Sequence, residues 1–192
     1  MIEKIYLGLV LVFFILAFAI KNIQTYFSTR QSIRGRSTKV TLSVLISTII
    51  YCLIISRLTF LDPKWLIEID FSSFVILKSI GLVLVTLGFV LGILALIKMR
   101  NSWRVGIKYD QKTDLVTTGI YRISRNPYFL SYDILIFGYI LIFPSLLLIL
   151  LYLTLVVVFH RMIIEEEKYL MSVHDSTYLD YKKKVDRYLT IK

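Results

Sequence analysis

The sequence is dominated by apolar stretches that are long enough to cross a membrane. Hydrophobic residues make up 57% of the 192 positions, against roughly 45–50% in a soluble domain. A helix needs about 20 apolar residues to cross the hydrocarbon core of a bilayer. We therefore predict an all-α integral membrane protein with about five transmembrane helices, near residues 5–20, 40–56, 74–97, 129–143 and 145–159.

The last two apolar stretches are separated by little more than Pro144. A proline with almost no polar linker predicts a tight helix–turn–helix hairpin. Residues 1–60 then hold two N-terminal helices, and residues 61–192 form a core with the third span, a long polar loop, the hairpin and a tail. The basic tail from Tyr178 to Leu189 predicts a cytoplasmic amphipathic helix that lies on the membrane.

The charges of the chain are sorted by loop. Basic residues gather in the loops at 21–39 and 98–128 and in the tail, whereas the loop at 57–73 carries Asp62, Glu68 and Asp70 against Lys64. This asymmetry places the two basic loops and the C-terminus in the cytoplasm and the N-terminus outside. Basic residues next to apolar stretches suit lipid headgroups, so we expect no nucleic acid partner despite the net charge of +10.

Two features of the sequence have simple interpretations. Ala17-Phe18-Ala19 resembles a signal-peptide cleavage site, but the start of the chain is only weakly basic, so we expect a retained membrane anchor. Cys52, His160 and His174 do not have the spacing of zinc ligands, and we expect no metal site.

A stripe of small residues runs along the predicted third span. Gly81, Gly88, Gly92 and Ala95 fall at helical spacing, and Gly88 and Gly92 form a Gly-x-x-x-Gly pattern. Such a stripe lets another helix approach closely. It indicates either packing within the chain or a homodimer face.

Two polar clusters lie at the ends of the predicted hairpin. Asn126 and Pro127 suit the start of a helix, where free N–H groups can also bind a carboxylate. After the hairpin come Glu165, Glu166 and Glu167. A solvated charge run would explain them, but three consecutive residues fan around roughly 200–300° of a helix, so at least one should face the bundle. A carboxylate in that position suggests a functional site, whereas we expect Asp133 to have a structural or supporting role.

Blocks of residues within about 95–190 resemble a known family. They are Arg125-Asn126-Pro127-Tyr128-Phe129, Glu166-Glu167-Lys168-Tyr169-Leu170, Tyr178, Tyr181, Arg187 and the segments 101–106 and 114–121. Together they resemble the isoprenylcysteine carboxyl methyltransferases, especially bacterial members, and, more broadly, the membrane phospholipid methyltransferases. The resemblance implies a location in a bacterial cytoplasmic membrane. This chain has Asn126 where the family has His, Phe129 where it has Tyr, and Met162 where several members have Arg.

The resemblance implies an S-adenosylmethionine-dependent methyltransferase that acts on a lipid-like or prenylated substrate with a carboxyl, amine or thiol acceptor. It implies that Arg161, Glu167 and Arg187 are catalytic, with Arg161 or Arg187 holding an anionic group of the substrate. It further implies a cofactor pocket, with Glu166 at its polar end, formed by Leu115, Val116, Tyr121, Arg125, Asn126, Pro127, Tyr128, Phe129 and Glu166.

Two alternatives remain at this stage. A membrane reductase of the steroid-reductase type would have a similar C-terminal architecture and use NADPH. A non-enzymatic lipid-binding membrane protein would explain the departures at Asn126 and Phe129.

Overall fold

The fold is known from a computed structural model that describes residues 1–35, 37–59, 67, 69, 75–109, 111 and 113–191. The predicted acidic loop, with Asp62, Lys64, Glu68 and Asp70, lies outside the described residues. Within them the chain forms the predicted all-α fold. Its elements are α1 (Ile2–Thr29), α2 (Thr38–Leu58), α3 (Val75–Met99), η1 (Arg100–Ser102), η2 (Gly119–Arg122), α4 (Pro127–Ile142) and α5 (Leu146–Lys184).

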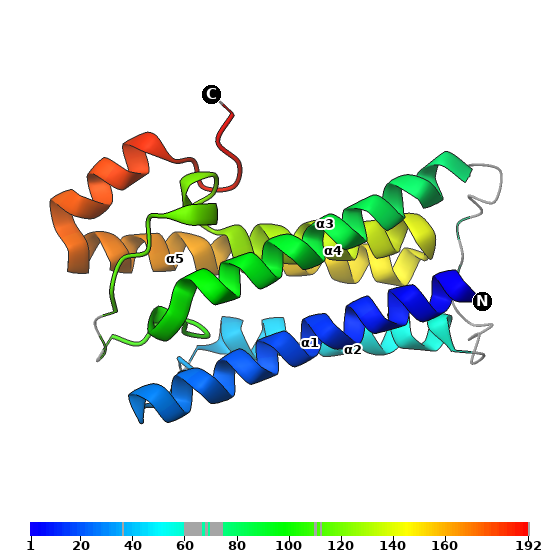
Figure 1. Ribbon diagram of the computed structural model, residues 1–192, viewed down its shortest axis with the longest axis horizontal. Coiled ribbons are helices and arrows are strands. Elements are labelled where there is room, and N and C mark those ends of the chain that lie inside the picture. The colour runs from blue at the N-terminus through cyan, green and yellow to red at the C-terminus, as the bar shows by residue number, and fades with distance from the viewer. Residues whose placement is uncertain are drawn as a thin grey trace.

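The five α-helices run alternately up and down the long axis of the molecule (Figure 1). One end of the molecule therefore holds the loop after α1, the loop before α4 and the C-terminus. The predicted hairpin already implied that the last two lie at the same end. Among the described helices, four are long and apolar enough to cross a membrane, whereas α4, with 16 residues, is a shorter apolar helix. Which side of the membrane each end faces stays a prediction.

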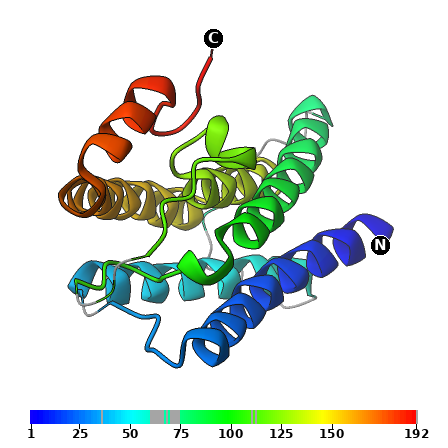
Figure 2. The same ribbon diagram turned by 60° about the vertical axis from the view of Figure 1, so that its left-hand side comes forward.

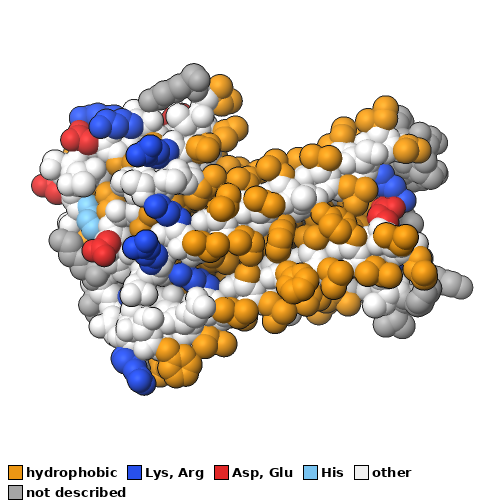
Figure 3. Space-filling view, in the orientation of Figure 1, with side chains coloured by type: hydrophobic (Ala, Val, Ile, Leu, Met, Phe, Trp, Pro, Cys, Tyr) orange, Lys and Arg blue, Asp and Glu red, His pale blue; other side chains and the backbone are white. Residues whose placement is uncertain are grey.

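The side chains divide the surface into an apolar trunk and a charged end, which we call the head (Figure 3). Large apolar side chains such as Phe13, Val83 and Val157 are more than half exposed on the trunk. Exposure of this kind is unfavourable in water but not against lipid tails, which are themselves apolar. The protein is an integral membrane protein, with its polar head at one end of the bundle.

The glycine stripe of α3 packs within the chain. A Cβ added at Gly88 would lie 2.6 Å from the backbone nitrogen of Leu135 in α4, and one at Gly81 would lie 2.7 Å from Ile142. One at Gly92 would meet Phe14 of α1 at 2.6 Å. A homodimer through the Gly88 and Gly92 face would need this surface to be free, so the packing within the chain is the alternative that the structure supports.

Helix α5 continues past its apolar part, which ends near Phe159, and turns back at Asp175, where φ is 45° and ψ is −122° (Figure 2). Beyond the turn, Tyr178 and Tyr181 are buried. The helix ends at Lys184, before the predicted end at Leu189, and its tyrosine face packs on protein. Burying two tyrosine rings against the 113–126 loop favours this arrangement, and the Tyr181 hydroxyl donates to the Tyr121 carbonyl at 2.6 Å. Contact of the basic face of this helix with the membrane stays a prediction.

The close approach of α3 and α4 predicts that Gly88→Ala destabilises the protein. The new methyl group would strike the backbone of Leu135, which cannot move independently of α4, so we expect a loss of about 1–3 kcal/mol. Thermal unfolding in detergent measures it. Gly8→Ala is the matched control, because its Cβ would meet only Leu58 at 4.0 Å; equal effects of the two substitutions would contradict the prediction.

Candidate active site

A cavity of about 460 Å³ lies where the trunk meets the head. This volume is in the range of sites that hold small molecules and cofactors. The nine residues that the family resemblance implied for a cofactor pocket come from the loop at 100–126, which includes η2, and from α4 and α5. All of them line this cavity: Leu115, Val116, Tyr121, Arg125, Asn126, Pro127, Tyr128, Phe129 and Glu166. The structure therefore brings together the two polar clusters at the ends of the hairpin.

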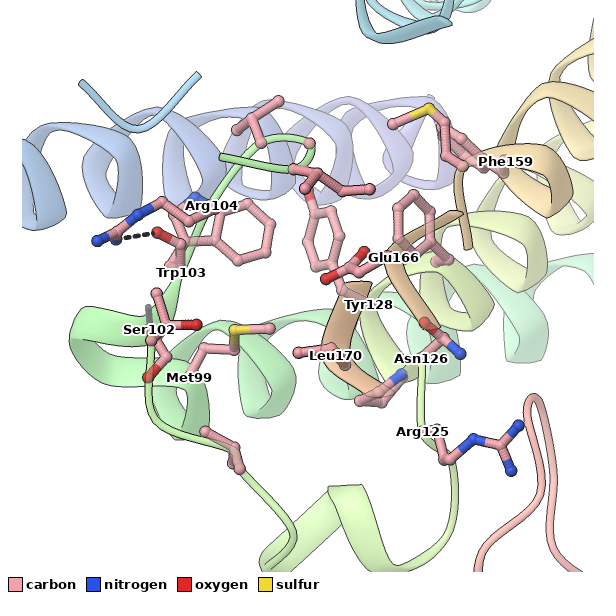
Figure 4. Close-up of a pocket in the computed structure, with 18 of the residues that line it drawn as sticks. Met99, Ser102, Trp103, Arg104, Arg125, Asn126, Tyr128, Phe159, Glu166 and Leu170 are labelled. Atoms are coloured by element: carbon pink, nitrogen blue, oxygen red, sulfur yellow. Dashed lines mark hydrogen bonds between the residues drawn. The ribbon is translucent and has the colours of Figure 1, made fainter. Parts of the chain in front are cut away.

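Aromatic rings form the wall around the start of α4 (Figure 4). Pro127 occupies the first helical turn, where its missing N–H is not needed. Tyr128 follows it and packs edge-on against Trp103, with ring centroids 5.0 Å apart, and it stacks against Phe18 of α1 at 6.1 Å. The Trp103 indole donates to the Asn22 side chain at 2.7 Å. This wall is thus fixed by both packing and a hydrogen bond.

The segment at 103–111 is held between the first loop and α5. Val105 forms a parallel bridge with the first loop, in which Gly35 N donates to Val105 O and Val105 N donates to Ile33 O, both at 2.9 Å. On the opposite side, the Tyr169 hydroxyl lies 3.2 Å from Lys108 O and 3.0 Å from Gln111 O. This polar edge of the cavity is therefore ordered by contacts with distant parts of the chain.

The three consecutive glutamates of α5 have three different environments. Glu165 pairs with Lys39 of α2, and both side chains are about 40% exposed. Glu166 lines the cavity, and Glu167 is only 5% exposed. The prediction that at least one of them faces the bundle is confirmed.

Glu167 is held between two arginines from distant parts of the chain. Arg125 donates to its Oε1 from Nη2 at 2.6 Å and from Nε at 3.1 Å, and Arg187 donates to its Oε2 from Nη2 at 2.8 Å. Burial by itself would raise the pKa of Glu167, but the hydrogen bonds from Arg187 and Arg125 outweigh it and hold the pKa below its usual range. Glu167 is therefore an ionised anchor for both arginines.

Residues 185–190, which we call the C-terminal strap, run alongside residues 123–126. Arg125 N donates to Asp186 O at 3.0 Å, and Thr190 N donates to Ile123 O at 2.8 Å. The Asn126 side-chain nitrogen donates to Arg187 O at 3.2 Å. The side chain of Asn126 thus binds the strap by a hydrogen bond. This contact needs only an amide donor and no titratable group.

Two of the three predicted catalytic residues lie outside the cavity lining. Arg187 points to Glu167, and Arg161 is exposed. The third, Glu167, lines the cavity, but both of its oxygens are bonded to arginine. The predicted roles of Arg161 and Arg187 in holding an anionic substrate group stay predictions, and Asp133 does not line the cavity either.

Glu166 is the carboxylate that faces the cavity. Figure 4 shows it among the side chains that line the cavity. It lies past the apolar part of α5, and burial, together with the neighbouring Glu167 carboxylate, raises its pKa to about 7. Within the described part of the chain it forms no hydrogen bond or ion pair, so its oxygens are available to a ligand.

Helix α2 also contributes to the cavity, although no motif in the sequence predicted it. Ser43, Ser47 and Tyr51 line the cavity from this helix, at intervals of four residues on one face. That spacing in an otherwise apolar helix was a usable signal. Apart from this spacing, the first two helices carry no motif beyond their apolar composition.

The fold and the site define a class of protein: a helical membrane protein with a ligand-sized cavity between the trunk and the head. The chain belongs to the phospholipid methyltransferase family, whose family model matches residues 77–176. A solved structure, the eukaryotic intramembrane Ras methyltransferase isoprenylcysteine carboxyl methyltransferase, has a similar fold, with a TM-score of 0.54 and 23% sequence identity. The match covers 82% of this chain and 54% of that one, so this chain spans about half the length of that protein. A search of curated proteins finds no match.

The environments of the glutamates predict unequal effects of two neighbouring substitutions. Glu167→Ala leaves the Arg125 guanidinium, 6% exposed, without its carboxylate, and removal of one partner of a buried pair costs about 3–5 kcal/mol. Glu165→Ala breaks an exposed pair and should cost less than about 1 kcal/mol. Unfolding in detergent compares the two variants, and equal losses would show that the buried cluster does not stabilise the head.

Proposed function

We propose that the protein transfers a methyl group from S-adenosylmethionine to a lipid-like or prenylated acceptor at this cavity. The observation that carries the proposal is the meeting of nine residues, chosen from the sequence as a cofactor pocket, around one cavity. The family match supports methyl transfer, and the position of the cavity next to the apolar trunk supports a lipid-like acceptor.

The residues present suit the cofactor. The faces of Tyr121 and Tyr128 suit a sulfonium cation. The start of α4, after Asn126, offers backbone N–H groups to a carboxylate. Glu166 can accept hydrogen bonds from hydroxyl or ammonium groups. S-adenosylmethionine would supply an already activated methyl group, so the protein mainly has to orient the partners and exclude water.

The deeper part of the cavity suits the apolar partner, and we call it the inner arm. It is lined from α1, α2, α4 and the apolar part of α5, by Ile15, Phe18, Ser43, Val44, Ser47, Thr48, Tyr51, Phe129, Tyr132 and Phe159. Phe159 contacts both Phe129 and Tyr132, at 4.9 and 5.3 Å between ring centroids. Binding of an apolar acceptor there is favoured because it buries the apolar surface of the acceptor and of the cavity wall away from water.

Binding of S-adenosylmethionine tests the donor half of the proposal. We expect calorimetry in nanodiscs to show micromolar-range affinity, and Val116→Arg to weaken it by about tenfold or more, because a cation then enters the cavity next to a cationic ligand. Thr118→Arg is the control, since Thr118 is exposed and does not line the cavity. Binding of NADPH in place of S-adenosylmethionine would favour the reductase instead.

Transfer of a labelled methyl group tests the reaction itself. We expect label from S-adenosylmethionine to enter the lipid fraction of membrane extracts with the wild type and with Thr118→Arg, and much less with Val116→Arg, which should bind the donor poorly. Donor binding without labelled lipid under any condition would support the non-enzymatic lipid-binding alternative.

A further inference from the structure

We infer, on the basis of the proposed function, that Glu166 is a catalytic residue that accepts a proton from the methyl acceptor. The acceptor is then a hydroxyl, thiol or neutral amine on a lipid-like molecule, and not a carboxylate. Three observations support this inference: the position of Glu166, the engagement of other charged groups around the cavity, and the composition of the inner arm.

Glu166 lies between the two parts of the cavity. Phe159, Met162 and Glu166 line it from one face of α5, at the three- and four-residue spacing of a helix. Phe159 belongs to the inner arm, whereas the charge of Glu166 interacts with Tyr121 and Tyr178 at the polar end. A donor at the polar end and an acceptor in the inner arm would therefore meet beside this carboxylate.

Among the other charged side chains that line the cavity, Asp114 is exposed, whereas Arg104, Arg125 and Glu167 are engaged elsewhere. Arg125 and Glu167 bond to each other. Arg104 donates to Trp103 O at 2.7 Å and to the Gln111 side chain at 2.9 Å, and its guanidinium points away from the cavity (Figure 4). Asn126 cannot titrate. Glu166, without a partner among the described residues, is thus the group best placed to take up a proton.

The inner arm provides no counter-charge for an anionic acceptor. Among its described lining residues there is no Lys, Arg or His, and its polar groups are the hydroxyls of Ser43, Ser47, Thr48, Tyr51 and Tyr132. A carboxylate there would lose its hydration without a cationic partner and would be repelled by Glu166. An uncharged group that carries a proton avoids both penalties and can hydrogen-bond to the hydroxyls.

The chemistry balances with Glu166 in this role. The lone pair of the acceptor oxygen, sulfur or nitrogen forms the bond to the methyl carbon as the carbon–sulfur bond of the donor breaks. The electron pair of that bond stays on sulfur, which becomes a neutral thioether. Glu166 takes the proton that the acceptor loses, and the carboxyl later releases it to water.

A set of lipids that differ only in their reactive group tests the identity of the acceptor. Hexadecanol, hexadecanethiol, hexadecylamine and hexadecanoic acid share one tail, and a total membrane lipid extract serves as the natural mixture. With labelled donor, we expect methylated products that survive mild base, which cleaves methyl esters. Labelled methyl ester as the main product would overturn the inference and leave the proposed function standing. Donor binding without any labelled product would overturn both.

The pH dependence tests the role of Glu166. Its ionised form is the one that accepts a proton, so the rate should rise with pH up to the pKa of about 7 and then level off. Glu166→Gln keeps the size and hydrogen bonding of the side chain but should lower kcat by about a hundredfold or more and abolish this pH dependence. A flat wild-type profile, or one shared by the variant, would contradict proton transfer to Glu166.

Two measurements without turnover distinguish proton acceptance by Glu166 from a role of Glu166 in binding the cofactor. The affinity for S-adenosylhomocysteine should change less than about threefold in Glu166→Gln. Infrared difference spectra of the ligand-free protein should show a protonated carboxyl band that disappears as pH rises through about 7 and is missing from the variant. Weaker binding with unchanged kcat would assign Glu166 to cofactor binding. If the glutamine variant does not fold, Glu166→Asp, whose carboxyl is one methylene shorter, should lower kcat but keep the pH dependence and the affinity for S-adenosylhomocysteine.

Discussion

The ion pairs of Glu167 with Arg125 and Arg187 are the interaction on which the head depends. They join three segments that are far apart in the sequence: the loop before α4, the extramembrane part of α5 and the C-terminal strap. They also fix the rotation of α5. Successive residues of a helix are about 100° apart, so turning Glu167 toward the arginines points Glu166 into the cavity. A structural contact thereby sets the orientation of the proposed catalytic group.

The head resolves a conflict between burial and charge. A cavity with apolar walls excludes water. The backbone polar groups of the loops around it therefore need partners within the protein. The structure meets this need with contacts between distant segments, such as Val105 with the first loop and Asn126 with the strap. Glu166 lines the cavity without a hydrogen-bond partner among the described residues, and buried groups of this kind cluster at functional sites.

The sequence predicted the features that depend on local pattern. Apolar length predicted the helices, and Pro144 predicted the hairpin that brings Asn126 and Glu166 to the same end. It could not predict features that depend on packing between distant segments. Tertiary contacts decide whether the Gly88 stripe faces α4 or a second copy of the chain. They also decide whether Tyr178 and Tyr181 are buried against protein. The same holds for Arg187, whose partner Glu167 lies twenty residues away across the turn at Asp175.

The cavity is built from two parts of the chain with different relationships to the family. The family match begins at residue 77, whereas Phe18, Ser43, Ser47 and Tyr51 of the inner arm lie before it. Substitutions in α1 and α2 can therefore reshape the inner arm while the shared polar end stays the same. If the proposed function holds, relatives can differ in their methyl acceptor while they hold the donor in the same way, and a comparison restricted to residues 77–176 would not detect that difference.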